Sequence, residues 1–212
     1  MFSNTERENL KHIAQLYGKV KELIIFCEEN HDEFKSNLHV VKELRDAFDH
    51  LMRIFAVKLD IKEEKDGNYI EINMEKVFGH VYRAGYDTLD FAAIILRDKI
   101  NKEVIGFSSS AIQAAIPTYY SEVRPSVENI TSDIIKLRIN KDVANPSAEV
   151  FESYFQKTIK LQEILEKIRS AKPAIVEYEN KKHNEKLKNT ALNIVVGILI
   201  GVVLVIIGLF FK

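Results

Sequence analysis

Two short polar stripes are the part of this sequence whose residue types could do chemistry. Each holds an aspartate, a histidine and an arginine at helical spacing, so each would lie on one face of a helix. The stripes are Asp46, His50 and Arg53, and His80, Arg83 and Asp87. Histidine exchanges protons near neutral pH, so such a face could support acid–base chemistry. If residues 60–73 fold the two helices into an antiparallel hairpin, the stripes would lie close together.

A short motif overlaps the first stripe. Four residues separate Arg45 from His50, and Asp46 follows the arginine directly. This pattern resembles the R-x(4–6)-H motif of the HEPN superfamily, which are small helical bundles found in toxins, CRISPR effectors and anti-phage systems. The resemblance implies a metal-independent endoribonuclease in bacterial defence, acting as a dimer with the motifs of both subunits lining one cleft.

The same resemblance assigns a role to each motif residue. Arg45 would neutralise the scissile phosphate, His50 would act as general acid or base, and Asp46 would orient them. The RNA would supply its own 2′-OH as nucleophile, so we expect no metal and no other cofactor. Arg53, His80, Arg83 and Asp87 would form a supporting polar stripe.

The polar stripes have a second interpretation that needs no catalysis. Ladders of Arg, Asp and His across a helical hairpin can be half-buried ion-pair networks that fix how two helices pack. Arg7 and His12 also have the motif spacing near the start of the chain, so spacing alone does not single out Arg45 and His50. Both interpretations remain open at this point.

The composition is that of a globular protein with long helices. Hydrophobic residues make up 46% and charged residues 29%, which excludes a disordered chain. The net charge of −1 excludes a global basic field for nucleic acid, so any contact with RNA must be local. Cys27 is the only cysteine, which excludes an internal disulfide and a cysteine-based zinc site.

Hydrophobic periodicity predicts an up-and-down bundle. A first helix should start at Thr5, with Glu8 completing a capping box, and run to about residue 30. A second should cover 32–59, with a buried stripe that we list as Leu38, Val41, Leu44, Phe48, Leu51 and Phe55. A loop at 60–73, with a possible extended piece at 69–72, should lead to a third helix capped by Asn73.

The second half of the bundle is less regular at first. Region 104–122 should be irregular, apart from a short helix in AIQAAI, and Pro125 should open a helix to about residue 141. Asn145 and Pro146 should open the next helix. Its buried stripe is expected to be Phe151, Tyr154, Thr158, Leu161, Leu165 and Ile168. Pro173 should kink or break that helix.

The C-terminal stretch 191–211 has the character of a membrane span. It carries no charge, and about 20 apolar residues in a helix cross roughly 30 Å of hydrocarbon. Four lysines precede it, at Lys181, Lys182, Lys186 and Lys188, and only Lys212 follows, so the N-terminal domain should be cytoplasmic. We therefore expect a single-pass membrane protein whose partner is the lipid bilayer, with an architecture that resembles that of tail-anchored proteins.

Three glycines could form a pairing face on that span. Gly197 and Gly201 have the small-xxx-small spacing, and Gly208 continues the same face. Close approach of two such helices would give a homodimer or higher homo-oligomer.

The sequence thus predicts an all-α protein in three parts: a helical bundle at 1–172, a helical stalk at 173–190 and a transmembrane helix at 191–211. Two functions fit this organisation. One is a membrane-tethered HEPN-like effector that cleaves RNA. The other is a non-catalytic helical sensor, scaffold or membrane-perturbing protein with a protein partner that the sequence does not identify.

Overall fold

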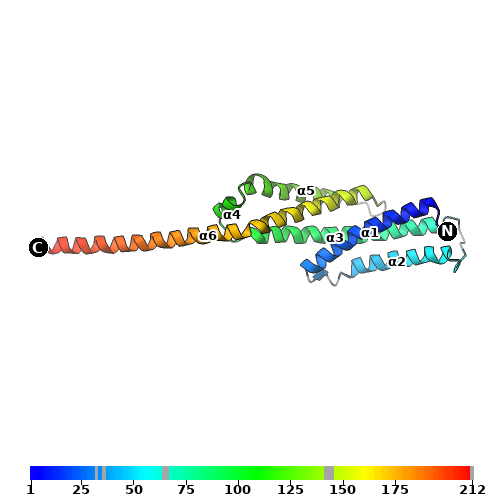
Figure 1. Cartoon of the computed structure of the whole chain (residues 1–212), viewed down its shortest axis with the longest axis horizontal. Helices are drawn as coiled ribbons and strands as arrows, with labels where there is room; N and C mark the ends of the chain where they lie inside the picture. The colour runs from blue at the N-terminus through cyan, green and yellow to red at the C-terminus, as the bar shows by residue number, and fades with distance from the viewer. Residues whose placement is uncertain (32, 35–36, 64–66, 141–145, 211–212) are drawn as a thin grey trace. The chain divides into compact units, whose positions relative to one another are not determined.

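The computed structural model describes residues 1–31, 33–34, 37–63, 67–140 and 146–210, with side chains as far as residue 206. Within these ranges the chain forms six α-helices and a π-helical turn, and no strand (Figure 1). In chain order they are α1 (Asn4–Asn30), α2 (Leu38–Lys58), α3 (Tyr69–Val104), α4 (Ser109–Ala115), η2 (Tyr119–Val123), α5 (Arg124–Ile139) and α6 (Ala148–Phe210). The predicted all-α fold is confirmed.

The chain divides into two compact units. The first joins Met1–Lys102 to Pro125–Leu165, and the second joins Glu103–Arg124 to Glu166–Lys212. Helix α6 contributes to both. The predicted boundaries at residues 173 and 191 fall inside this unbroken helix, and they stay predictions.

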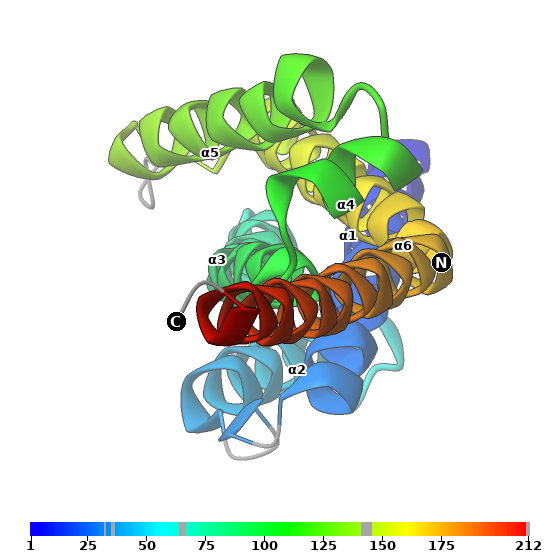
Figure 2. The ribbon, with the colours of Figure 1, turned by 90° about the vertical axis from the view of Figure 1, so that its left-hand side faces the viewer.

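The first unit is a bundle of α1, α2, α3, α5 and the first turns of α6. Within it α2 lies at one edge and α5 at the opposite edge, as both views show (Figures 1 and 2). A half-buried network links three helices of the bundle: the Tyr154 hydroxyl of α6 donates to Asp90 of α3 at 2.8 Å, and Arg138 of α5 pairs with the same carboxylate at 3.1 Å. Burial comes first among the causes that raise the pKa of Tyr154, so this hydroxyl stays a donor.

Gly85 marks the closest approach of three helices in this unit. A Cβ atom there would lie 2.6 Å from the ring of Phe151 on α6 and 2.7 Å from Val20 on α1. Only a residue without a side chain lets α3 pass between these two helices.

The second unit consists of α4, η2 and α6 from Glu166 onward. The Ser108 hydroxyl donates to Glu179 of α6 at 2.6 Å, and Lys182 of α6 donates to Ser110 at 2.8 Å. Glu103 accepts hydrogen bonds from Arg169 at 3.2 Å and Lys172 at 2.5 Å. These contacts join the region 103–124 to one stretch of α6.

Several predicted helix starts are wrong by a few residues. The capping box of α1 uses Ser3 and Glu6 rather than Thr5 and Glu8. Helix α2 starts at Leu38, where Asn37 accepts a hydrogen bond from Val40 N–H. Helix α3 starts at Tyr69, so residues 69–72 are helical and Asn73 lies inside the helix. At the starts of α1 and α2 a polar side chain, Ser3 or Asn37, accepts a hydrogen bond from a backbone N–H of the first turn. The short helix predicted in AIQAAI is present as α4.

The predicted core stripe of α2 is also wrong. Leu38, Val41 and Phe48 are 78%, 60% and 59% exposed, whereas the buried residues of α2 are Val40, Ala47 and Ile54. The helix is therefore rotated relative to the prediction, and it turns a more polar face inward.

Helix α6 agrees with its prediction at every position of the expected stripe. Phe151, Tyr154, Thr158, Leu161, Leu165 and Ile168 are all buried, and Ile175 continues the pattern. Pro173 does not break the helix, which runs as 63 residues from Ala148 to Phe210. A proline removes one backbone hydrogen bond, and formed turns on both sides keep the helix continuous here. The predicted opening residue Asn145 and the predicted end of α5 at Lys141 lie outside the described residues.

Residues 191–206 of α6 are apolar apart from Asn193, and all of them are exposed. Every described residue of this segment lies on the surface, including Leu199 at 59% and Leu204 at 63%. A core helix of a water-soluble protein would bury such residues, so this segment is no part of either core. It is the one described helix long and apolar enough to cross a membrane.

Candidate functional site

The two predicted polar stripes meet in part, along the seam between α2 and α3. His50 Nδ1 lies 2.8 Å from Asn73 Oδ1, and His80 Nδ1 lies 2.8 Å from Glu43 Oε2. The rings of His50 and His80 stack with centroids 5.4 Å apart. Arg83 Nε donates to Glu43 Oε2 at 2.8 Å. We call these five residues the seam cluster.

The spacing of the seam cluster follows from antiparallel helix packing. Glu43 and His50 are seven residues apart on α2, and Asn73 and His80 are seven apart on α3. Seven residues are two helical turns, so each pair lies on one face. An antiparallel hairpin then matches Glu43 with His80 and His50 with Asn73 in one register.

The contacts determine which nitrogen of the neutral His50 ring carries the proton, but they allow two hydrogen-bonding roles for Nδ1 of His80. Asn73 Nδ2 donates to the Tyr69 carbonyl at 2.7 Å, so its Oδ1 faces His50 and accepts from His50 Nδ1. A neutral His50 therefore carries its proton on Nδ1 and its lone pair on Nε2. His80 Nδ1 lies 2.8 Å from Glu43 and 2.7 Å from Arg83 Nη2, so it can donate to the first or accept from the second.

Glu43 is ionised in this setting. Its side chain is 13% exposed, and burial raises its pKa, but hydrogen bonds from Arg83 and His80 outweigh burial and hold the pKa below its ordinary value. The carboxylate thus neutralises Arg83 inside the seam. This arrangement is a paired, half-buried ion network, as the second interpretation of the stripes predicts.

The predicted catalytic residues do not converge within the chain. Arg45 is 71% exposed and donates to its neighbour Asp46 at 2.7 Å, and Lys42 pairs with Asp46 at 3.3 Å. Five residues along a helix turn the side chain by about 140°, so Arg45 and His50 point to different sides of α2. Hydrogen bonding from Arg45 is the leading cause that lowers the pKa of Asp46.

The remaining predicted residues divide between surface and seam. Arg53 pairs with Asp49 at 2.6 Å on the exposed side of α2, away from the seam cluster. His80 and Arg83 belong to the cluster, and Asp87 lies half-buried one turn further along α3. Arg7 and His12, the second pair with the motif spacing, are exposed on α1.

Two members of the seam cluster were missed by the sequence reasoning. Glu43 and Asn73 carry no motif, but Glu43 stands seven residues before His50 on α2, and Asn73 stands seven residues before His80 on α3. Matching these two seven-residue spacings in an antiparallel hairpin would have found both. Asn73 was instead interpreted as a helix cap.

The anchor glycines face open space. A Cβ atom built on Gly197 or Gly201 would meet nothing within 4 Å. Gly208 lies beyond the residues whose side chains are described. Pairing through this face stays a prediction.

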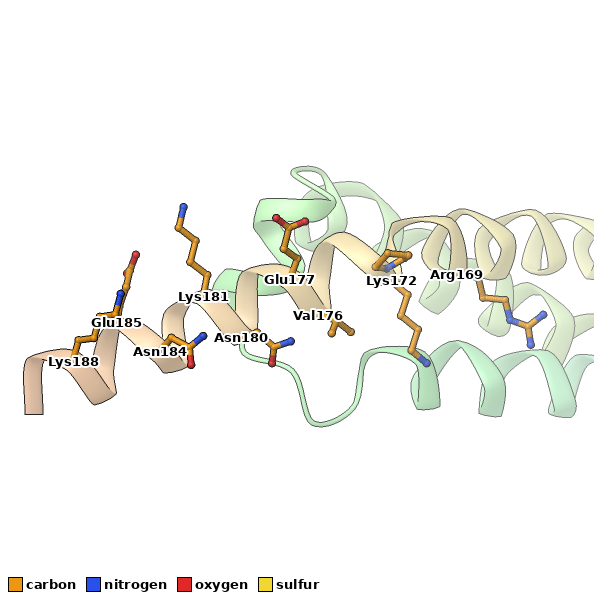
Figure 3. A pocket seen from close by; sticks show the side chains of 10 residues that line it. Arg169, Lys172, Val176, Glu177, Asn180, Lys181, Asn184, Glu185 and Lys188 are labelled. Atoms are coloured by element: carbon orange, nitrogen blue, oxygen red, sulfur yellow. The ribbon is translucent and has the colours of Figure 1, made fainter. Parts of the chain in front are cut away.

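A depression with a volume of about 1040 Å³ lies on α6 of the second unit. Its lining residues come from a single helix, between Arg169 and Lys188. Figure 3 shows Glu177 and Lys181 projecting from one side of α6 and Lys172 and Asn180 from the other. The side chains diverge, so we assign no ligand to this depression. Among the described residues, no three His, Cys, Asp or Glu side chains lie close enough to hold a metal ion.

Comparison with known proteins adds no identity to this geometry. No family model matches the chain, and no curated protein and no solved structure is significantly similar to it. The fold defines a class: an all-α bundle with one helix long and apolar enough to cross a membrane. The resemblance to the HEPN superfamily rests on Arg45, Asp46 and His50.

Proposed function

We propose that this protein is a single-pass membrane protein whose helical domain is a non-catalytic scaffold held at the bilayer. One observation carries the proposal. Helix α6 has a buried face as far as Ile175, and the same helix continues without a break into an exposed, apolar segment at 191–206. The bilayer is the solvent that such a segment requires.

The seam cluster supports a structural role for the polar stripes. Glu43, His80 and Arg83 satisfy one another across α2 and α3. Paired networks of this kind specify helix register, and they do not need a substrate. A scaffold uses them to hold one arrangement of its helices.

The lysines before the span support a cytoplasmic domain. Lys181, Lys182, Lys186 and Lys188 are all exposed, and positive residues remain on the cytoplasmic side of a membrane. A cysteine replacing Glu185 should react with a membrane-impermeant maleimide only after sealed cells are opened. Native Cys27 is buried and its pKa is raised to about 12, first by burial and then by Glu28, so it should give no background. Labelling of the cysteine in intact cells would show that the helical domain lies on the outer side of the membrane.

Charges placed in the span test the anchor. A charged residue at the centre of a span costs about 2.5–3.5 kcal/mol, so Leu199→Arg with Val203→Arg should release the protein from membranes washed at high pH. Leu187→Arg is the matched control, because Leu187 is 55% exposed and precedes the span. If the double variant and the control both remain with the membrane, a part of the chain other than the span holds the protein there.

A second function, RNA cleavage as a HEPN-like effector, is favoured by one observation. The hydrogen bond to Asn73 holds the proton of neutral His50 on Nδ1, which leaves a lone pair on His50 Nε2 that can act as a general base. Arg45 is exposed and can therefore contact a phosphate. His50→Ala and Arg45→Ala should then abolish RNA cleavage, while Arg7→Ala and His12→Ala should not. Equal behaviour of the two pairs, or no cleavage by the unmodified protein, removes this function.

A further inference from the structure

The outward face of α2 is apolar and uncovered. Leu38, Val41, Phe48 and Met52 are at least 40% exposed, and they follow one another with Arg45 between them at alternating spacings of three and four. This is the spacing of a coiled-coil seam. It lies on the opposite side of α2 from buried Val40, Ala47 and Ile54.

We propose that this face, residues 38–52 of α2, pairs with the same face of a second copy of the chain in antiparallel orientation. The inference goes beyond the proposed scaffold, since an anchored domain need not pair through α2. The face lies at the edge of the first unit, where no other described helix covers it (Figure 2).

Charge complementarity selects a second copy as the occupant. Lys42 and Asp49 flank the apolar stripe on the same side, seven residues apart. About a two-fold axis near residue 46, Lys42 of each copy faces Asp49 of its partner, which gives two reciprocal ion pairs. Parallel pairing would instead place Arg45 of one chain against Arg45 of the other.

The polar residue inside the stripe fits the same arrangement. In the antiparallel register that aligns Val41 with Met52, Arg45 lies over Phe48 of the partner. A guanidinium over an aromatic ring is favourable, and a single polar residue in a seam specifies register. Within one chain Lys42 pairs with Asp46 and Asp49 pairs with Arg53, but Lys42 and Asp49 are themselves exposed, so both pairs are weak and can exchange partners.

Cross-linking of the full chain in detergent tests the orientation. Lys42→Cys and Asp49→Cys variants, mixed, should be joined by a short bismaleimide, whereas either variant alone should not. Asp49→Cys mixed with Lys102→Cys controls for random collision, because Lys102 is on the exposed end of α3. Cross-linking of Lys42→Cys to itself would overturn the antiparallel arrangement.

Charge reversal tests the contact itself. Lys42→Glu should raise the dimer dissociation constant about ten-fold, and Lys42→Glu with Asp49→Lys should restore it. Lys102→Glu is the matched control, because Lys102 forms the same type of exposed i,i+4 pair with Asp98. Circular dichroism should show equal helix content in all variants, because every changed side chain is exposed.

The remaining outcomes overturn the proposal. A wild-type chain that is monomeric at tens of micromolar would leave the face to a different protein. A dimer that survives Lys42→Glu unchanged, but is lost in Gly201→Ile, would place pairing in the membrane span instead.

Discussion

The two faces of α2 reverse the usual relation between polarity and burial. The inward face carries Glu43 and His50 into the seam with α3, and the outward face exposes Leu38, Val41 and Phe48. A charged residue tolerates burial when partners satisfy it, as Arg83 and His80 satisfy Glu43. An apolar stripe that no described residue of the chain covers is the feature that needs explanation.

Helix α6 shows the same contrast along its length rather than across its faces. Its first turns bury apolar residues against other helices, and residues 191–206 expose apolar residues on every side. An exposed stripe on one side of a helix suits a protein partner, while exposure all round suits lipid. The difference separates the proposed roles of α2 and α6.

Removing the carboxylate of the inward face should have the largest effect. Glu43→Ala leaves Arg83 and His80 without their acceptor in a half-buried seam, at a cost of about 2–3 kcal/mol. The value lies below that of a fully buried pair because the Arg83 side chain is 30% exposed. Denaturant unfolding of the full chain in detergent measures the loss.

An outward carboxylate on the same helix is the control for Glu43. Asp49 is 59% exposed and pairs with Arg53, so at a concentration where the chain is monomeric Asp49→Ala should change the free energy of unfolding by about 0.5 kcal/mol or less. Equal losses of unfolding free energy for Glu43→Ala and Asp49→Ala would mean that the contacts of Glu43 in the seam stabilise the fold no more than an exposed ion pair does.

His50→Ala should cost less, about 1–2 kcal/mol. The substitution removes the hydrogen bond to buried Asn73 and the stacking on His80, but it leaves no charge unpaired. His50→Asn could keep a donor toward Asn73 and should recover part of the loss. A double-mutant cycle with Asn73→Ala measures the pairwise coupling, and a coupling near zero would contradict the contact.

These contacts also show why the sequence predicted α6 better than α2. On α6 the apolar residues from Phe151 to Ile168 form one stripe, so periodicity alone identifies its buried face. On α2 two faces compete, and the more apolar face was assigned to the core. The choice depends on the residues that α3 presents, Asn73 and His80, and a local pattern contains no information about them.

The candidate site, like the fold, could be predicted from the sequence only in part. Spacing correctly predicted that His50 lies near His80, because an antiparallel hairpin brings the two helices together. The structure places Arg45 and His50 on different sides of α2, because five residues turn a helix by about 140° and a motif read along the chain does not record that turn. Whether the motif cleaves RNA stays a prediction.

Acid should weaken the inward face, with a smaller effect than either substitution there. The pKa of Glu43 is lowered in the folded chain, so the unfolded chain binds more protons as the pH falls below about 4.5. The stabilisation from Glu43 is therefore complete above that value and lost as the pH falls through the lower folded value. Other carboxylates behave similarly, so the measured quantity is the difference between wild type and Glu43→Gln. This difference should shrink from pH 6 to pH 3, and a constant difference would contradict the assignment.

Arg45→Ala should have the smallest effect on stability and the greatest power to separate the two functions. Arg45 is 71% exposed and pairs with its neighbour Asp46, so the free energy of unfolding should change by about 0.5 kcal/mol or less. The measurement is made at a concentration where the chain is monomeric, because Arg45 lies in the proposed pairing face. In a scaffold, this variant unfolds like wild type and differs only in self-association. In a ribonuclease, it also unfolds like wild type but loses RNA cleavage that wild type shows. A large loss of stability fits neither function, and it would mean that Arg45 packs against the protein in a way that its exposed position does not allow.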